Sequence, residues 1–522
     1  MKSKRISVLF MFIFLISIKE SSTEAMEFFQ PVKPSRPIQV IAHRGLNISA
    51  PENTIPAFEL CIKNYYEWIE IDVRLTKDKQ HVIIHDSSLE RTTDGKGLVS
   101  EYALEQIRSL DAGSWFAPRF KGARVPTLPE TLNFCKGRIN IYLDCKDIDP
   151  ILLVKEIKDA KMENQVIVYD DPKSLKIIES ESKGAIATMP NYRTNPDISA
   201  WIGDSRPVAL EIKYESVTPE LISKLKNAGV IAQVQCLGPS DNPKTWDQLI
   251  NMGVEWIQTD HSEGVIASYT WNIVSEKRSV LMAAHRGAKS LAPENTLSSY
   301  KKAIELGLDF IEIDIHQTQD GKLVLLHDDS LKRTTGLDKS VRDIDYAEIR
   351  KLSAGEWFGI LYKDEKIPSI DEVFEMAKGK IKFYVDFKDG KPEDLVDAMR
   401  RHKVVDDCVI YGNPKRLSEI KSLEPKAKVM PGLGDPKQID DLINICQPYA
   451  FDTKWGILSK ELISECHSKG IKVFSDSMGD HENIDDFYQA MEWGIDCIQT
   501  DEPIILLRAI ELYVKSNQNR GS

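Results

Sequence analysis

The chain contains the segments His43-Arg44-Gly45, Pro51-Glu52-Asn53-Thr54, Glu70-Ile71-Asp72 and His85-Asp86. The same pattern returns 242 residues later as His285-Arg286-Gly287, Pro293-Glu294-Asn295-Thr296, Glu312-Ile313-Asp314 and His327-Asp328. A self-match of this length has the size of one (β/α)8 barrel and is far longer than a solenoid repeat. A chain of 522 residues is also too long for a single core. The repeat therefore predicts two similar domains in tandem.

Shorter matches extend the repeat over each domain at an offset of 241 or 242 residues. They pair Gly113-Ser114-Trp115-Phe116 with Gly355-Glu356-Trp357-Phe358, Asp144-Cys145-Lys146 with Asp386-Phe387-Lys388, and Gln258-Thr259-Asp260 with Gln499-Thr500-Asp501. The nearly constant offset indicates that the two copies have barely gained or lost residues relative to each other.

Short apolar runs alternate with amphipathic stretches within each copy, which is typical of a parallel α/β sheet. We expect eight strands in the first copy, at 38–42, 68–73, 139–145, 166–169, 185–189, 207–212, 230–235 and 255–259, and eight more in the second. An open doubly wound sheet is the alternative, but no glycine-rich dinucleotide loop is present. The sequence thus predicts two tandem (β/α)8 TIM barrels, each with a small insertion after strand 2, which is 77–126 in the first copy.

The strand pattern sets the domain boundaries. We expect barrel 1 over 38–261, a linker over 262–279 and barrel 2 over 280–512. The polar C-terminal residues 515–522 are expected to be frayed.

The N-terminus is typical of a secretory signal peptide over residues 1–25. A basic start is followed by an apolar run, 6–18, that is short for a membrane span, and small residues precede a cleavage point after Ala25. An uncleaved anchor is the alternative. We expect a secreted or periplasmic protein with no stable membrane insertion after cleavage.

The formal net charge of −12 argues against broad binding to nucleic acid or anionic membranes. It allows a small anionic substrate, because a metal and a few basic residues can invert the field locally. The eight cysteines form no CxxC pair, so a zinc site is unsupported, and we expect mostly buried thiols.

Paired carboxylates predict a metal site. Glu70 and Asp72 are two residues apart on strand 2, so they share one face of the strand, where a hard divalent cation would relieve their repulsion. Asp144 at the end of strand 3 is a candidate third ligand. A two-residue hairpin turn after strand 2 would place His85 opposite Asp72, and likewise His327 opposite Asp314.

Basic and polar residues surround this metal site. His43 follows strand 1, at the barrel end where catalytic groups gather. Arg44 and Lys146 are candidate phosphate contacts. Glu52 is a candidate substrate contact, and Asn53 is either a site residue or a helix cap. The set suits metal-assisted displacement at a phosphodiester, with the histidines as acid and base.

These motifs, in this order and spacing, resemble the glycerophosphodiester phosphodiesterase family over nearly all of the chain after the signal peptide. The resemblance implies hydrolysis of glycerophosphodiesters to sn-glycerol 3-phosphate and an alcohol, with one Ca or Mg ion per barrel. It implies acid/base roles for His43, His85, His285 and His327. Candidate metal ligands are then Glu70, Asp72, Asp144, Glu312, Asp314 and Asp386, and candidate substrate contacts are Arg44, Glu52, Lys146, Arg286, Glu294 and Lys388. The family usually has glutamate where this chain has Asp144 and Asp386.

Two alternatives stay open at this point. A lysophospholipase D-type activity would need an apolar groove beside the metal, which Trp115, Phe116, Trp357 and Phe358 could line or could instead fill as insertion core. In the other alternative, one barrel is catalytic and the second is a non-catalytic binding module.

Overall fold

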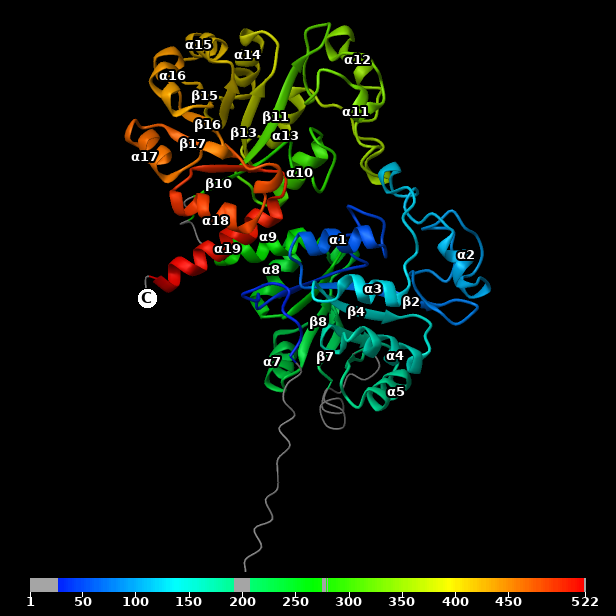
Figure 1. Cartoon of the computed structure of the whole chain (residues 1–522). Coiled ribbons are helices and arrows are strands. Elements are labelled where there is room, and N and C mark those ends of the chain that lie inside the picture. Colours follow the sequence, from blue (N-terminus) through cyan, green and yellow to red (C-terminus); the bar gives the residue numbers. More distant parts are fainter. Residues whose placement is uncertain (1–26, 192–206, 275–277, 279, 521–522) are drawn as a thin grey trace, which may run out of the picture.

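The computed structural model describes residues 27–191, 207–274, 278 and 280–520, and the predicted signal peptide lies outside this part of the chain. Two closed barrels follow one another in sequence and pack together, with helices around each sheet (Figure 1). No helix within the described part is long and apolar enough to cross a membrane.

Barrel 1 contains eight parallel strands among its described residues. They are β1 (Gln39–Ala42), β2 (Trp68–Leu75), β4 (Asn140–Cys145), β5 (Val166–Tyr169), β6 (Ala187–Met189), β7 (Ala209–Lys213), β8 (Ile231–Gln235) and β9 (Trp256–Thr259). The sheet runs β6-β5-β4-β2-β1-β9-β8-β7. A parallel bridge between Asn191 and Glu211 joins β6 to β7, so the sheet closes and the open-sheet alternative is wrong. Each predicted strand is confirmed to within two residues.

Barrel 2 repeats this topology over its own described residues. Its strands are β10 (Leu281–Ala284), β11 (Phe310–Gln317), β13 (Lys382–Phe387), β14 (Cys408–Gly412), β15 (Lys428–Leu433), β16 (Ala450–Lys454), β17 (Lys472–Asp476) and β18 (Cys497–Thr500). Strand β10 pairs with both β11 and β18 and closes the barrel.

Helices cover the outside of both sheets. Around barrel 1 they are α1 (Ile55–Lys63), α3 (Leu128–Cys135), α4 (Pro150–Ala160), α5 (Pro172–Ser182), α7 (Pro219–Asn227), α8 (Pro243–Met252) and α9 (Ser262–Ile273). Around barrel 2 they are α10 (Leu297–Glu305), α13 (Ile370–Ala377), α14 (Pro392–His402), α15 (Pro414–Leu423), α16 (Ile439–Cys446), α17 (Lys460–Ser468), α18 (Ile484–Trp493) and α19 (Pro503–Arg520). Many of these helices begin with a proline that follows a capping residue. In α4, for example, the Asp149 side chain accepts hydrogen bonds from two backbone amides of the first turn.

An insertion follows strand 2 in each barrel, as predicted. It opens with a short antiparallel strand, β3 (His81–Ile83) or β12 (Leu323–Leu325), and carries α2 (Leu104–Arg108) in barrel 1 and α11 (Lys332–Thr335) and α12 (Tyr346–Ile349) in barrel 2. Each insertion has a small apolar core of its own.

The predicted hairpin register is wrong by one residue. Thr318 N donates to Lys322 O, so the loop has three residues and not two. Gly321 takes a left-handed φ of 84°, as expected where a three-residue loop ends in a bulge. Asp314 therefore faces Leu326, whose N donates to Asp314 O, and Asp72 likewise faces Ile84.

The interval predicted as a linker, 262–279, is mostly helix. Residues Ser262–Ile273 form α9, which completes barrel 1 by packing against α8 and β1. The sequence contains too few turn residues there to end the domain at 261. Residues 515–520, which were expected to be frayed, form the last part of α19.

Polar bonds and aromatic contacts join the two barrels. Helix α19 lies along α9 (Figure 1). Glu263 of α9 pairs with Lys302 of α10 at 3.0 Å, and the buried Arg36 pairs with Glu511 of α19 at 3.0 Å. The insertions meet where Ile360 N donates to Phe116 O at 2.8 Å. All eight cysteines are free thiols and seven are buried, as predicted.

Candidate active sites

Three carboxylates meet at the upper end of each barrel. Glu70 and Asp72 project from β2 and Asp144 from β4, with one oxygen of each within 4.8 Å of the others. Barrel 2 repeats this group with Glu312, Asp314 and Asp386. Burial and then the charges of Asp72 and Asp144 raise the pKa of Glu70 well above its ordinary value. The negative charge is thus concentrated and undercompensated.

These carboxylate groups fit a hard divalent cation. Oδ1 of Asp72 and Oδ1 of Asp314 are buried without a hydrogen bond. The ammonium of Lys146 lies 3.3 Å from Asp72 Oδ1, at ion-pair distance only. Oxygen-only donors are those that Ca²⁺ and Mg²⁺ prefer. The aspartate at position 144, where the family usually has glutamate, still reaches the group.

A carboxylate at the end of the last strand orients the first histidine. His43 Nδ1 lies 2.7 Å from Asp260 Oδ1, and His43 Nε2 lies 4.0 Å from Glu70 Oε2. In barrel 2, His285 Nδ1 lies 2.6 Å from Asp501 Oδ1. The sequence prediction attached no chemistry to Asp260. The repeated Gln-Thr-Asp at the end of strand 8 was the signal for it.

The second histidine has a carboxylate partner as well. His85 Nδ1 lies 2.7 Å from Asp86 Oδ1, and His327 Nδ1 lies 2.7 Å from Asp328 Oδ1. Both histidines stand beyond the paired part of the hairpin. Burial raises the pKa of Asp144 above its ordinary value, and the charges of Lys146 and His85 partly offset this rise, so the second histidine lies near that carboxylate. The structure therefore brings the second histidine to the metal carboxylates, although not by the predicted register.

Arg44 and Arg286 adopt a left-handed backbone, with φ of 57° and 56°. This conformation is uncommon for a side chain as large as arginine. It directs the Arg44 backbone N onto Glu70 Oε2 at 2.8 Å while its guanidinium donates to Glu52 at 2.9 Å. Asn53 is not the helix cap, which is Thr54; its amide donates to Asp72 Oδ2 at 2.8 Å.

Glu52 is held by two arginines. Besides Arg44, it accepts two bonds from Arg91, whose Nε also donates to Asp86 at 2.7 Å. Glu294 and Arg333 repeat this bridge in barrel 2. The sequence prediction missed Arg91 and Arg333. In this geometry Glu52 positions basic residues and the second histidine's carboxylate, while its contact with substrate stays a prediction.

A model of the glycerophosphoryl diester phosphodiesterase family matches residues 43–263 and again residues 285–505. The chain belongs to the glycerophosphoryl diester phosphodiesterase family. The two matches coincide with the two barrels and include every residue described above. Membership makes the chain a phosphoric diester hydrolase.

Several relatives have the length of one barrel. The glycerophosphodiester phosphodiesterase of Caldanaerobacter subterraneus subsp. tengcongensis is 32% identical over 44% of this chain and 97% of its own length. That of Bacillus subtilis is 29% identical over 46% and 89%. A glycerophosphodiester phosphodiesterase from Agrobacterium tumefaciens aligns with a TM-score of 0.41 and 29% identity, covering 43% of this chain and 97% of its own. An Oleispira antarctica phosphodiesterase solved with sn-glycerol-3-phosphate aligns with a TM-score of 0.39 and 26% identity, covering 45% and 97%.

One difference separates the two family sites at the first histidine. Barrel 1 has Asn47, whose amide donates to Asp260 at 2.5 Å. Barrel 2 has Lys289 at that position, 2.7 Å from Asp501 Oδ1 and 3.2 Å from His285 Nδ1. Burial, with the charges of Lys289 and Arg286, lowers the pKa of His285 despite Asp501. Asn47 also begins the glycosylation sequon Asn47-Ile48-Ser49, and its amide is engaged inside the site.

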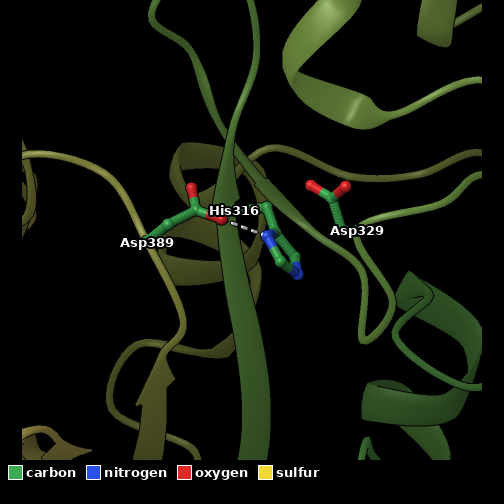
Figure 2. Close-up of side chains that lie close together, drawn as sticks. All are labelled: His316, Asp329 and Asp389. Atoms are coloured by element: carbon green, nitrogen blue, oxygen red, sulfur yellow. Dashed lines mark hydrogen bonds and ion pairs between the residues drawn. The ribbon is translucent and has the colours of Figure 1, made fainter.

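A third cluster in barrel 2 contains His316, Asp329 and Asp389 (Figure 2). His316 pairs with Asp389 through Nδ1, and its Nε2 lies 3.2 Å from the His327 carbonyl. Barrel 1 has Arg74 in this place, donating to the His85 carbonyl at 2.8 Å. The guanidinium of Arg342 already pairs with both aspartates. This cluster therefore supports the second histidine of the family site.

Of the four aromatic residues considered for an apolar groove, Phe116 and Phe358 are buried, whereas Trp115 and Trp357 are partly exposed. Phe116 and Phe358 are each 3% exposed. Phe116 packs edge-on against Phe120, and Arg119 stacks over Phe358 at 4.1 Å, so these rings lie where the two insertions meet. The interpretation as insertion core is therefore supported for the two phenylalanines.

Proposed function

We propose that each barrel hydrolyses glycerophosphodiesters to sn-glycerol 3-phosphate and an alcohol, using one Ca²⁺ or Mg²⁺ ion per barrel. The proposal is carried by two histidines per barrel whose Nδ1 atoms are anchored on carboxylates, beside a buried three-carboxylate group. Anchoring of Nδ1 leaves Nε2 for proton transfer. Family membership and the name of the relative at 32% identity support the substrate class.

In barrel 1 the cation would be held by Glu70, Asp72 and Asp144. When bound, it supplies charge neutralisation and polarisation at the phosphoryl group. Arg44 and Lys146 stand on either side of Asp72, 3.4 Å and 3.3 Å from its oxygens, where they bind and orient phosphoryl oxygens.

The histidines move the protons. One of His43 and His85 takes the proton of the attacking hydroxyl, which belongs to water or to a substrate hydroxyl group. In the second case a cyclic phosphodiester forms, and water opens it to glycerol 3-phosphate in a further step. The other histidine donates a proton to the alcohol oxygen as its bond to phosphorus breaks. Asp260 and Asp86 keep each imidazole in the tautomer and orientation that this exchange needs.

The test uses the full chain with alanine in place of the histidine pair of one barrel, of the other, and of both. Glycerol 3-phosphate release from glycerophosphocholine is assayed with Ca²⁺, Mg²⁺ and EDTA. We expect partial activity in each single-barrel variant, and a loss of at least about 1,000-fold in the variant lacking all four histidines, matched by EDTA. Unchanged release in that variant would refute the proposal. If one single-barrel variant is as inactive as the fourfold variant, the barrel that was left intact in it is a non-catalytic module.

We also propose that the mature chain is secreted or periplasmic, on the strength of the basic start and apolar run at its N-terminus. Fractionation of expressing cells and N-terminal sequencing test this. Export with a mature chain beginning at Met26 is expected, and an intact Met1 in the cytoplasm would contradict it.

A further inference from the structure

Each barrel has a mostly apolar floor made of one inward side chain per strand. In barrel 2 the floor consists of Ala283, Phe310, Tyr384, Val409, Met430, Ala450, Phe474 and Cys497. Because successive side chains alternate across a strand, the residues two positions later face the same interior, one level nearer the active-site end. We call these eight residues the mouth ring: His285, Glu312, Asp386, Tyr411, Gly432, Asp452, Asp476 and Gln499.

The mouth ring of barrel 1 stands at the corresponding positions. Its members are His43, Glu70, Asp144, Tyr169, Asn191, Glu211, Gln235 and Gln258. Five of the eight positions are identical in the two rings. The three that differ lie on adjacent strands, the fifth to the seventh, roughly opposite the histidine and metal carboxylates on strands one to three. A substrate whose phosphoryl group binds the metal carboxylates must extend one of its arms toward these strands.

We call these three positions on strands five to seven the sector. In barrel 1 its one carboxylate, that of Glu211, has both oxygens in hydrogen bonds. Glu211 accepts from the Tyr142 hydroxyl at 2.7 Å and from the Asn191 amide at 3.1 Å. Its neighbour in the ring is the uncharged Gln235. The sector of barrel 1 therefore holds one carboxylate with its own partners.

In barrel 2 the same three positions hold two carboxylates with fewer partners, although the Tyr384 hydroxyl remains beside Asp452. Gly432 replaces the asparagine and removes its amide. Asp452 and Asp476 lie on the adjacent strands β16 and β17, and the Oδ1 atom of each is buried without a hydrogen bond. Burial and then the charge of Asp476 raise the pKa of Asp452, and burial and then Asp386 raise the pKa of Asp476 to about 7. Lys388, the cation that acts on Asp476, is already paired with Asp386 and Asp314.

Within the described residues, these two half-buried carboxylates each have a buried oxygen without a hydrogen bond and no paired cation, which favours a positive ligand. Within the described residues, neither Asp452 nor Asp476 belongs to a group whose ligand atoms converge on a metal-sized space. An organic cation, which two carboxylates can hold without a third ligand, fits this pair better than a second metal ion does. The Tyr411 ring on β14 adds an aromatic wall of the kind that ammonium groups favour.

We propose that Asp452 and Asp476 make barrel 2 selective for glycerophosphodiesters whose alcohol carries a positively charged ammonium group, a preference that barrel 1 lacks. This inference rests on the proposed function and assigns different substrates to the two barrels.

The experiment compares substrates within one variant, so that general folding defects cancel. In the full chain with barrel 1 inactivated by His43→Ala and His85→Ala, kcat/KM is measured for glycerophosphocholine and for glycerophosphoglycerol. Asp476→Gln, which copies barrel 1, and Asp452→Asn should each lower the ratio of the two values at least about ten-fold. The reciprocal Asn191→Gly and Gln235→Asp pair, with barrel 2 inactivated, should raise the ratio.

A binding measurement keeps this inference separate from the proposed function. Calorimetry with choline chloride should show binding to the full chain that Asp476→Gln weakens at least about ten-fold, whether or not any diester is hydrolysed. A ratio that stays constant would overturn the selectivity. Equal losses of kcat/KM for both substrates, together with no choline binding, would also overturn it and would indicate that the two aspartates accept hydrogen bonds from the glycerol hydroxyls instead. Absence of glycerol 3-phosphate from every diester would overturn the proposed function alone.

Discussion

Asp260 and Asp501 are the residues that complete each active site, although they lie more than 200 positions from the histidines they contact. Each places a carboxylate on Nδ1 of the first histidine. A carboxylate there fixes the tautomer with the proton on Nδ1 and stabilises the imidazolium that proton transfer creates. No local spacing indicates this pairing, because barrel closure alone brings the last strand beside the first.

The variant Asp260→Asn should therefore lower kcat of barrel 1 by about 100-fold or more, because an amide can donate to Nδ1 and hold the wrong tautomer. The measurement is steady-state turnover in a chain whose barrel 2 histidines are alanine. Asp170→Asn, a change outside the histidine contacts on the loop after β5, serves as the control. A kcat for Asp260→Asn within two-fold of the parent would argue that Asp260 has no orienting role.

Lys289 should set the pH range of barrel 2. Its charge helps burial to lower the pKa of His285, so Lys289→Asn should raise that pKa. The limb of the kcat/KM profile that His285 governs then moves to higher pH, whether His285 serves as acid or as base. Profiles are measured with barrel 1 inactivated. Asn47→Lys in barrel 1 is the matched reverse change and should move its limb to lower pH, and coincident profiles would exclude the effect.

The strands of both barrels follow directly from apolar runs in the sequence, but two connecting elements do not. The hairpin after strand 2 has a three-residue loop in both copies, although Asp320-Gly321 is also a good two-residue turn. Local sequence cannot separate these loops, since both accept glycine at a left-handed position. Helix α9 was missed because its apolar residues surround the helix instead of forming one stripe, as it packs against both barrels.

The repeated Gly-x-Trp-Phe of the insertions is an element whose role only the structure explains. A Cβ on Gly113 would lie 2.0 Å from the Phe120 backbone O, so the chain can pass there only with glycine. Gly113→Ala should lower the free energy of unfolding by about 3 kcal/mol, as for severe overpacking. Thermal unfolding followed by circular dichroism measures this. Gly456→Ala, where a Cβ meets open space, is the control and should change the melting temperature little.

At the scale of the molecule, the repeat predicted two barrels and two complete catalytic sets, and the structure adds that the sets are not equivalent. Lys289 replaces Asn47, and Asp476 replaces Gln235, while the metal carboxylates and histidines are the same. The differences lie around a shared centre. They could not be assigned from sequence alone, because inward and outward positions on strands five to seven are known only once the floor of each barrel is seen.

The two barrels are also held together by buried charge, which makes their association sensitive to acid. Burial opposes ionisation of Glu263, but Lys302 from the other barrel and His261 lower its pKa from an ordinary 4.5 to about 2. A carboxylate with a depressed pKa stabilises the folded state above its unfolded pKa, and this stabilisation is lost as the pH falls through the folded value. Its contribution is therefore complete near pH 7, falls to about half or less near pH 3 and is nearly lost at about pH 2.

Glu263→Gln should accordingly lower the free energy of unfolding by up to roughly 3 kcal/mol at pH 7. The difference in melting temperature between the variant and the natural chain should shrink by about half or more at pH 3, because the unfolded glutamate, with its ordinary pKa of 4.5, is protonated there. Scanning calorimetry at the two pH values gives the comparison. Asp159→Asn removes the exposed partner of Lys155 and should change neither melting temperature appreciably, because exposed pairs contribute little. A Glu263→Gln difference that is equal at both pH values would show that packing, and not charge, makes this residue matter to the union of the barrels.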